Sequence, residues 1–339
     1  MSNEIRAVGQ PRALPISDEN SLIDITIPAP TPGPNDLLVA VRAVSVNPVD
    51  YKVRGGQEPP VSPRVLGYDA AGTIQEVGSD VTLFAPGDTV YYSGDINRQG
   101  SNAELQAVDW RLAAKAPSSL TLEEAAALPL TTLTAWEGLF DKLKLTETSS
   151  GILLVAGGAG GVGSIVIQLV KALAPKVRVV ATASRPETQQ WVRDMGADDV
   201  VDHHGDVAEQ LRDIAPDGVD WIYTTNSQGQ LPLYQRILKV QGEVVAIDDY
   251  QELDIAFYKG KSLSWHWENI FARSQRQTPD MVRQHEILTR VAELIDNGKI
   301  RTTLTKTLRP IDAATLRQAH ELVESGTTIG KIVVTNGEG

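Results

Sequence analysis

The sequence predicts an α/β protein in which a doubly wound parallel sheet follows a domain of short strands and turns. From residue 151 to about 265, strand-like and helical segments alternate, as they do where helices connect parallel strands. Residues 22–110 instead hold short β-type runs separated by Gly, Pro and Asp, which favours a compact antiparallel β domain. A cluster of glycines follows the first strand of the alternating region.

The composition is that of a soluble chain long enough for two cores, with 339 residues. No window of about eighteen residues is uninterruptedly apolar, and the first residues show no secretory signal, so we expect neither a membrane span nor export. The formal net charge of -12 argues against non-specific nucleic-acid binding. The absence of cysteine excludes disulfides and thiolate zinc sites and is compatible with a reducing compartment, so we expect a cytoplasmic protein.

The clearest strand predicted in the β domain is at residues 37–46. A Pro-Gly-Asp turn precedes a short predicted strand at 89–92. Thr121, followed three residues later by Glu124, forms a capping box, so a short helix begins there. A second helical segment, 131–143, leads into the glycine-rich strand.

The alternating region divides by hydrophobic pattern into strands at 152–156, 177–183, 200–202, 219–224, 242–247 and 261–265, and helices at 162–174, 187–195, 207–214 and 231–240. The tail returns to a mixed pattern. We expect Thr278 to cap a helix that has Pro279 at its first position and Gly298 after its end, and Asp312 to cap another helix that Gly326 stops. A last strand is predicted at 331–335.

The glycines have the spacing G-x-G-x-x-G between a buried strand and an apolar helix. We expect Gly158 to allow the tight turn, Gly160 to let a pyrophosphate approach the backbone, and Gly163 to let the helix pack close to the strand. The free N–H groups at the helix start, around Gly161 and Val162, would then hold the phosphates. The alternative is a glycine turn with a structural role alone.

The end of the next strand indicates which dinucleotide is bound. An NAD site has an acidic residue about 20 positions after the glycine motif, where this chain has Ser184 and Arg185. A hydroxyl and a guanidinium suit the 2′-phosphate of NADPH. The alternative is that Arg185 is a solvated surface arginine partnered by Glu187. Further candidate cofactor contacts, at strand ends or in loops, are Asn226, Ile247 and Lys331.

Five local stretches accompany the mid-chain glycine motif: NPVDYK at 47–52, GYDAAG at 67–72, PGDTV at 86–90, GSNAE at 100–104 and LTAW at 133–136. Together they resemble the medium-chain dehydrogenase/reductase superfamily, over essentially the whole chain. The resemblance implies a GroES-like β domain plus a Rossmann doubly wound parallel sheet. Residues 1–127, completed by 271–339, would form the catalytic domain, and residues 128–270 the NADPH-binding domain.

Zinc members of that superfamily carry a cysteine where this chain has Asn47, and Gly-His-Glu where it has Gly67, Tyr68 and Asp69. A catalytic zinc ion needs three N, S or O ligands, and Asn47, Tyr68 and Asp69 are a poor set. The chain therefore resembles the zinc-free quinone oxidoreductase branch, including the subgroup often called zinc-type alcohol dehydrogenase-like. No metal site is expected.

The resemblance also assigns roles around the reacting atoms. It implies that Asn47 and Asp50 lie beside the nicotinamide and that Tyr51 and Lys52 lie near the substrate. Either Tyr51 or Lys52 is a candidate donor to a carbonyl oxygen as charge builds there. The alternative is that Tyr51 packs and Lys52 is solvated. Tyr68 is expected to line the same pocket.

We therefore expect an NADPH-dependent, zinc-independent reductase of quinones or α,β-unsaturated carbonyls, with Thr134 as a further nicotinamide contact. The resemblance implies a homodimer joined through the nucleotide domains. Two alternatives stay open: a zinc-dependent alcohol dehydrogenase, and an NADPH-binding sensor without turnover. The substrate, and the choice between hydride and single-electron transfer, are not given by the sequence.

Overall fold

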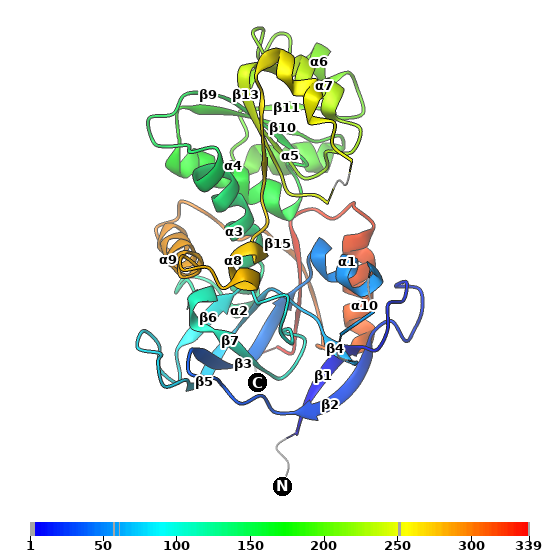
Figure 1. Ribbon diagram of the computed structural model, residues 1–339, viewed down its shortest axis with the longest axis vertical. Helices are drawn as coiled ribbons and strands as arrows, with labels where there is room; N and C mark the ends of the chain where they lie inside the picture. The colour runs from blue at the N-terminus through cyan, green and yellow to red at the C-terminus, as the bar shows by residue number, and fades with distance from the viewer. Residues whose placement is uncertain (1–3, 57, 61, 250–251, 338–339) are drawn as a thin grey trace. The chain divides into compact units, whose positions relative to one another are not determined.

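The computed structural model describes residues 4–56, 58–60, 62–249 and 252–337 (Figure 1). The chain divides into two compact units, which we describe separately. Unit 1 comprises residues 1–130 and 271–339, and unit 2 comprises residues 131–270.

Unit 2 is built on one parallel sheet. Its elements are β9 (Gly151–Ala156), α4 (Gly161–Leu173), β10 (Val177–Thr182), α5 (Pro186–Asp194), β11 (Asp199–Val201), α6 (Val207–Gln210), β12 (Val219–Thr224), α7 (Leu231–Ile237), β13 (Leu238–Ala246) and β14 (Ser264–Trp267). The strand order is β11-β10-β9-β12-β13-β14, so the chain winds outward from β9 in both directions. This arrangement confirms the predicted Rossmann-type sheet.

One face of this sheet is covered by α6, α7 and the 3₁₀ helix Ile255–Lys261 (Figure 1). The core on this face joins Leu154, Val180, Ile222 and Val244 from four adjacent strands. Successive residues of a strand point to opposite faces of the sheet. A strand that is apolar at successive positions, as these are, therefore has apolar side chains to bury on both faces.

Some predicted boundaries in unit 2 are wrong. The segment 231–240 was expected to be one helix, but α7 ends at Ile237 because Leu238 already pairs with Val219 of β12. The strand expected at 261–265 begins only at Ser264, since the 3₁₀ helix runs to Lys261. The helix expected at 207–214 ends at Gln210.

The helical segment before β9 is confirmed but is irregular. Helix α3 (Pro129–Trp136) continues as a π-helical turn, Glu137–Lys142. A Cβ on Gly138 would lie 2.5 Å from the Tyr223 ring, so this turn of helix packs against β12 only with glycine there. The Tyr223 hydroxyl donates to the Thr134 carbonyl at 2.8 Å, which fixes α3 to the same strand.

Unit 1 contains the strands β1 (Glu4–Gln10), β2 (Ile23–Pro28), β3 (Asp36–Ser45), β4 (Arg64–Val65), β5 (Ala70–Val77), β6 (Thr89–Tyr92), β7 (Leu105–Asp109), β8 (Ala113–Lys115), β15 (Leu304–Leu308) and β16 (Lys331–Thr335). Its helices are α1 (Pro48–Gly56), α2 (Leu122–Ala126), α8 (Phe271–Arg276), α9 (Arg283–Asp296) and α10 (Ala313–Glu324). The short 3₁₀ helix Trp110–Leu112 joins β7 to β8.

Two sheets organise unit 1. The larger has the order β15-β16-β3-β5-β6-β8, with β7 paired to β3, and the smaller has the order β2-β1-β4. All pairs are antiparallel except β15 with β16. The predicted GroES-like β domain is therefore confirmed, and the tail returns to it by placing β16 beside β3.

The sequence pattern missed three features of unit 1. Strand β1 lies before residues 22–110, the range in which we expected strands, and α1 begins directly after Asn47. The helix expected to start at Thr278 starts at Arg283, and residues 279–282 form turns. The capping box of Thr121 and Glu124 is present as predicted, and so is the cap of Asp312 on α10.

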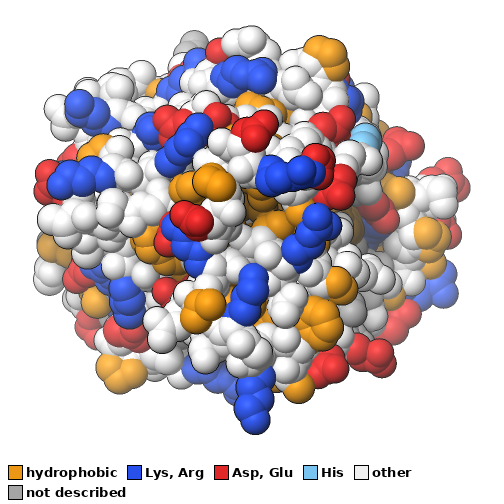
Figure 2. All heavy atoms as spheres, turned by 90° about the horizontal axis from the view of Figure 1, so that it is seen from above, with side chains coloured by type: hydrophobic (Ala, Val, Ile, Leu, Met, Phe, Trp, Pro, Cys, Tyr) orange, Lys and Arg blue, Asp and Glu red, His pale blue; other side chains and the backbone are white. Residues whose placement is uncertain are grey.

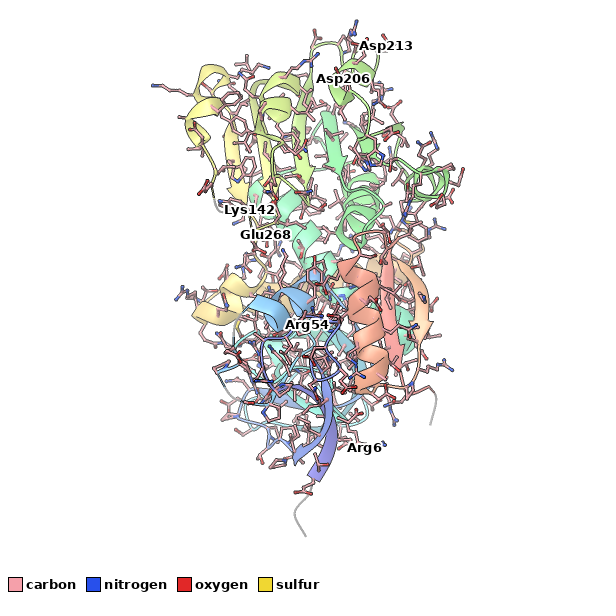
Figure 3. The ribbon with its side chains drawn as sticks, turned by 90° about the vertical axis from the view of Figure 1, so that its right-hand side faces the viewer. Arg6, Arg54, Lys142, Asp206, Asp213 and Glu268 are labelled. Atoms are coloured by element: carbon pink, nitrogen blue, oxygen red, sulfur yellow. The ribbon has the colours of Figure 1, made fainter. Side chains whose placement is uncertain are left out.

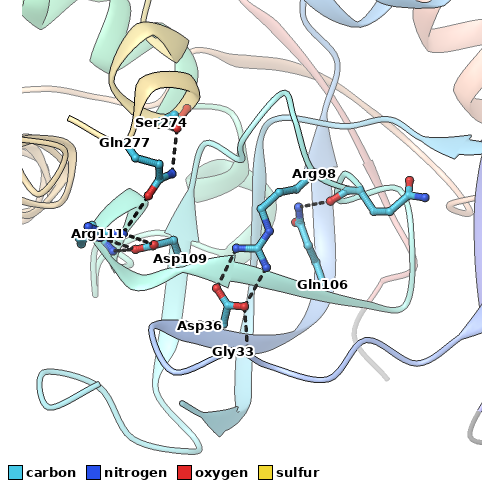
Figure 4. A network of polar contacts seen from close by, with 9 residues as sticks. Gly33, Asp36, Arg98, Gln106, Asp109, Arg111, Ser274 and Gln277 are labelled. Atoms are coloured by element: carbon cyan, nitrogen blue, oxygen red, sulfur yellow. Dashed lines mark hydrogen bonds and ion pairs between the residues drawn. The ribbon is translucent and has the colours of Figure 1, made fainter. Parts of the chain in front are cut away.

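Polar pairs tie loops of unit 1 to its sheet (Figure 4). Both terminal nitrogens of Arg98 lie 2.8 Å from the carboxylate oxygens of Asp36. Nearby, Arg111 pairs with Asp109 at 2.6 Å and reaches Gln277 at 3.3 Å. Such bidentate arginine–carboxylate contacts hold a loop in one geometry and also pair the two opposite charges.

The surface seen in Figure 2 carries side chains of both charges, interspersed with isolated apolar ones. This face shows no broad basic stripe of the kind that nucleic-acid binding requires. Within the described ranges, none of the helices has the length and apolar composition needed to cross a bilayer.

Candidate cofactor and active site

The turn between β9 and α4 is shaped by glycines. Gly157, with φ of +80°, makes the tight turn that we had assigned to Gly158. A Cβ on Gly158 would instead lie 2.9 Å from the Ala181 Cβ, so this glycine is needed for packing on β10. A Cβ on Gly163 would lie 2.4 Å from the Gly157 carbonyl oxygen, so α4 approaches the turn this closely only with glycine.

The start of α4 is open to a ligand. Gly160 is the N-cap, no side chain caps the helix, and a Cβ at Gly160 would have its nearest neighbour at 3.5 Å, an ordinary contact. The first N–H groups, from Gly161 and Val162, therefore lie at an uncapped helix N-terminus, which favours phosphate. Thr182 Oγ1 accepts from the Gly157 N–H at 3.0 Å and fixes the turn; the sequence analysis had missed it.

Ser184 and Arg185 follow β10, the strand that pairs directly with β9. Both side chains are half-buried. The Arg185 Nε lies 3.1 Å from Glu187 Oε1, the pairing anticipated by the surface-arginine alternative. The two side chains are 41% and 58% exposed, and an ion pair so exposed contributes only about 0–1 kcal/mol, so a phosphate can compete for Arg185.

The other expected cofactor contacts of unit 2 lie on the same sheet. Asn226 follows β12 and donates its N–H to Thr224 Oγ1 at 3.2 Å. Ile247 follows β13 and donates its N–H to the Thr224 carbonyl at 3.2 Å. Both residues therefore stand at carboxyl ends of neighbouring strands, the edge where doubly wound sheets bind ligands.

Lys331 belongs to unit 1 and is buried there, with 4% of the residue exposed. Its ammonium ion donates to the Val46 carbonyl at 3.0 Å and to Asn47 Oδ1 at 2.5 Å, and lies 3.4 Å from Asp69 Oδ2. Asn47 Nδ2 donates to that same Asp69 oxygen at 2.7 Å, and the Asn47 N–H donates to Asp50 Oδ2 at 2.7 Å. We call Asn47, Asp50, Asp69 and Lys331 the Lys331 cluster.

Burial dominates the ionisation of this cluster. It raises the pKa of Asp50 to about 7, opposed by the hydrogen bond from the Asn47 N–H and by the charge of Lys331. It raises the pKa of Asp69 to about 6, opposed by Lys331 and by hydrogen bonds from Asn47 and Leu130. It lowers the pKa of Lys331, although both carboxylates favour the charged ammonium ion.

Tyr51 and Lys52 follow the cluster on α1, where Tyr51 is half-buried and Lys52 exposed. Tyr68 is fully buried, with its ring edge-on to Phe271 at 5.5 Å and its hydroxyl accepting from Arg64 at 3.0 Å. Burial raises the pKa of Tyr68, so its hydroxyl keeps its proton. The structure thus brings Asn47 and Asp50 into hydrogen-bond contact. Tyr51 and Lys52 are the next two residues of α1.

The far end of α1 is held by Arg54, which is 1% exposed (Figure 3). Its guanidinium lies 2.8 Å from Glu324 Oε2 and 3.2 Å from His320 Nδ1, both on α10. Burial, with the Arg54 charge, lowers the pKa of His320 to about 3, so the ring is neutral and Nδ1 can accept. Sequence reasoning missed this anchor, because Arg54 and α10 are far apart in the chain.

Comparison with known proteins agrees with this architecture. Residues 33–118 match the model of the alcohol dehydrogenase GroES-like domain, and residues 195–334 match that of the zinc-binding dehydrogenases. A zinc-type alcohol dehydrogenase-like protein of Staphylococcus aureus (strain COL) is 42% identical over 311 residues, which cover 90% of this chain and 92% of the relative. The chain belongs to the medium-chain dehydrogenase/reductase superfamily. It is therefore related to oxidoreductases, as the motifs predicted.

Further relatives cover several activities. A 2-methylene-furan-3-one reductase of Solanum lycopersicum is 39% identical over 225 residues, 63% of this chain and 55% of the relative. A crystal structure from Rhizobium etli CFN 42, provisionally named a zinc-dependent alcohol dehydrogenase, has a TM-score of 0.95 and 45% identity, with both chains covered completely. A quinone oxidoreductase of Coxiella burnetii (TM-score 0.81) and a mycobacterial protein complexed with NADPH (0.83) are each 25% identical, over 98% of this chain and 99% of theirs.

Several of these names imply zinc, but the side chains of this protein do not fit the ion. Both Asp69 oxygens already accept hydrogen bonds, from the Leu130 N–H and from Asn47, and the Tyr68 hydroxyl is bonded to Arg64. The ammonium ion of Lys331 lies against Asn47 and Asp69 and would repel a second cation. In the described part of the chain, no three His, Asp or Glu side chains group as metal ligands. No reaction step is therefore assigned to zinc.

From the sequence, Lys331 was expected only as a cofactor contact, and Asp69 was considered only as a member of a poor zinc-ligand set. One available signal was a lone lysine at the first position of the predicted strand 331–335, directly before its apolar residues. A second was an aspartate inside the apolar segment 65–71. A charged residue in a buried strand needs a partner of opposite charge, but the pattern does not say which one.

Proposed function

We propose that the protein is an NADPH-dependent oxidoreductase that reduces quinones or α,β-unsaturated carbonyls by hydride transfer, without zinc. The observation that carries the proposal is the glycine turn with the uncapped start of α4, beside a strand that is followed by Ser184 and Arg185. The similar methylene-furanone reductase and quinone oxidoreductase support the substrate class. The similar mycobacterial protein complexed with NADPH supports the cofactor.

A bound nicotinamide would supply the hydride, and the chain's own residues would bind, orient and polarise the acceptor. We assign the hydrogen-bond donor for the carbonyl oxygen to Tyr51 or Lys52, because both lie on α1 with accessible surface. Asn47 and Asp50 would border the nicotinamide, and Tyr68 would form a wall of the substrate pocket. Thr134, Asn226 and Ile247 are proposed contacts of the cofactor.

The test is NADPH oxidation by protein that has been treated with a chelator, with an ortho-quinone and a simple enone as acceptors and NADH as the control. We expect turnover with NADPH and little with NADH. Turnover that appears only after zinc is added would overturn the proposal in favour of an alcohol dehydrogenase. Tight NADPH binding with no turnover across the acceptors would instead indicate a sensor.

Tyr51→Phe and Lys52→Met then separate the two candidate donors. The variant that removes the donor should lower kcat by about a hundredfold and leave the Kd for NADPH unchanged. Lys142→Met, a charge change outside α1, is the matched control. If both α1 variants had the same kcat as the Lys142→Met control, neither Tyr51 nor Lys52 would be the donor.

We further propose that the protein acts in the cytoplasm as a homodimer joined through unit 2. Strand β14 is at the edge of the six-stranded sheet, and Trp267 on it is 43% exposed. Phe257, in the adjoining 3₁₀ helix, is 46% exposed. An open strand edge beside exposed aromatic rings favours pairing between copies. Light scattering should give a dimer that Trp267→Arg converts to a monomer; a monomeric wild-type protein would contradict this.

A further inference from the structure

Asn47 stands where a helix N-cap belongs, directly before Pro48 at the first position of α1. An asparagine at this place normally caps its own helix by accepting N–H groups of the first turn with its side-chain oxygen. Here that oxygen accepts from Lys331 at 2.5 Å instead. The amide nitrogen of Asn47 is also engaged, by Asp69 at 2.7 Å and by the Ser45 carbonyl at 3.3 Å.

Asp50 completes the start of α1 from the other side. Its Oδ2 accepts from the Asn47 N–H at 2.7 Å, which is the contact that the acidic residue of a capping box makes. The Asp50 N–H in turn donates to the Asn47 carbonyl at 3.0 Å. The first turn of α1 is therefore held through Asn47, and the Asn47 side chain is held by Lys331 and Asp69.

The Lys331 cluster joins segments that are distant in the sequence. Lys331 is the first residue of β16, Asn47 follows β3, and Asp69 precedes β5. These three strands lie side by side in the larger sheet, in the order β16-β3-β5. Asp69 Oδ1 also accepts from the Leu130 N–H at 2.7 Å. Each charged group is buried, and a buried charge is tolerated only with such partners, so the cluster has one favourable arrangement.

The charges of the cluster are not balanced one to one. Two carboxyl groups, Asp50 and Asp69, face a single ammonium ion. If all three were ionised, the buried site would hold an excess negative charge, which is unfavourable in a low-dielectric interior. The ammonium ion of Lys331 is thus the cation on which the ionised state of the cluster depends.

We propose that Lys331 is a positioning residue of the reductase: its ammonium ion is a built-in cation that takes the electrostatic place of a metal and, through Asn47, orients the first turn of α1. The helix that carries Tyr51 and Lys52 is thereby fixed at its start. This inference rests on the proposed function for its kinetic consequence, but the ordering of α1 does not depend on it.

Three variants test the proposal: Lys331→Met, Asp69→Asn, and the two combined. The double variant removes the Lys331–Asp69 ion pair as a whole, so it should fold even if Lys331→Met alone does not. Lys306→Met, an exposed lysine on the neighbouring strand β15, is the matched control. Each variant is measured for hydrogen exchange over residues 48–56, for NADPH Kd, and for kcat and KM with the enone.

In the double variant we expect exchange over 48–56 to rise about tenfold or more and kcat to fall by a similar factor, while NADPH Kd stays within about twofold. Lys306→Met should match the wild type in all three measurements. Wild-type kcat and unchanged exchange in the double variant would overturn the proposal, because removing the pair would then leave α1 in place. If the wild-type protein itself fails to turn over any acceptor, the proposed function fails, and the exchange measurement alone decides the role of Lys331.

Discussion

The glycine turn of unit 2 and the Lys331 cluster of unit 1 are two different ways of building a site. The turn uses backbone atoms within a few residues, and its essential feature is the absence of side chains at Gly158 and Gly163. The cluster uses four charged or polar side chains between positions 47 and 331, all buried. A site made of backbone is sensitive to volume, whereas a site made of buried side chains is sensitive to charge. The comparison therefore predicts which substitutions damage each site.

Loss of the cation should have the largest effect. Lys331→Met leaves Asp69 buried without its ammonium partner, which lies at 3.4 Å in the wild type. We expect the free energy of unfolding to fall by about 3–5 kcal/mol in urea titrations, with most of it restored by adding Asp69→Asn. A single variant as stable as the wild type would show that the cluster is not sensitive to charge.

Added volume in the turn should come next. In Gly163→Val, a Cβ would lie 2.4 Å from the Gly157 carbonyl oxygen and 2.7 Å from the Gly158 Cα, both backbone atoms that cannot rotate away. We expect a loss of about 1–3 kcal/mol in stability and at least a hundredfold weaker NADPH binding by fluorescence titration.

Gly160→Ala is the matched control for that variant, because its Cβ would meet nothing closer than 3.5 Å. It should unfold at the wild-type urea concentration and still weaken NADPH binding, since the methyl group would stand where the pyrophosphate approaches. Unweakened binding would mean that the phosphates lie elsewhere.

The choice between cofactors should depend on one guanidinium group. Arg185→Ala is expected to weaken NADPH binding by about tenfold and leave NADH binding unchanged, because only NADPH carries the 2′-phosphate. Arg178→Ala, on the preceding strand β10 and paired with Asp199 at 2.7 Å, is the control and should change neither. Equal losses for both nucleotides would favour the surface role of Arg185.

Counted per pH unit, the smallest effect is the pH dependence of the cluster. The pKa of Asp50 is raised from 3.8 to about 7, so between these values the folded protein binds more protons than the unfolded chain and Asp50 costs stability as the pH rises. Asparagine imitates the protonated acid and keeps an acceptor for the Asn47 N–H. Relative to the wild type, Asp50→Asn should therefore gain at most about 1.4 kcal/mol per pH unit up to about pH 7 and then level off. A difference that is constant with pH in urea titrations would contradict this.

The elements predicted well are those in which local pattern and tertiary structure agree. The buried strand β9, the glycine turn and α4 lie together in the sequence, and each is specified by its own residues. The start of β13 was predicted wrongly because residues 231–240 carry a helical pattern, while pairing of Leu238 with Val219 extends the strand backwards. The Thr278–Pro279 pattern also predicted a helix start wrongly. Residues 279–282 form turns, and α9 begins after them.

The candidate site was predictable only in part, for the same reason. The motif 47–52 drew attention to Asn47 and Asp50, but Lys331 meets them only because β16 pairs with β3 in a defined register, with Val333 opposite Ser45. No local pattern contains that register. The Arg54 anchor likewise depends on α10, more than 250 positions away.

That pairing of β16 with β3 also bears on the order in which the molecule assembles. The Ser45 hydroxyl donates to the Ile332 carbonyl across 287 positions, with all of unit 2 synthesised in between. During translation, unit 2 can complete its sheet while unit 1 still lacks β15 and β16. Until β16 arrives, Asn47 and Asp69 lack the Lys331 cation, and residues 43–45 of β3 lack their pairing with β16. We therefore expect chaperone binding in vivo to concentrate on the early-made half of unit 1, the part that waits longest for its last strand.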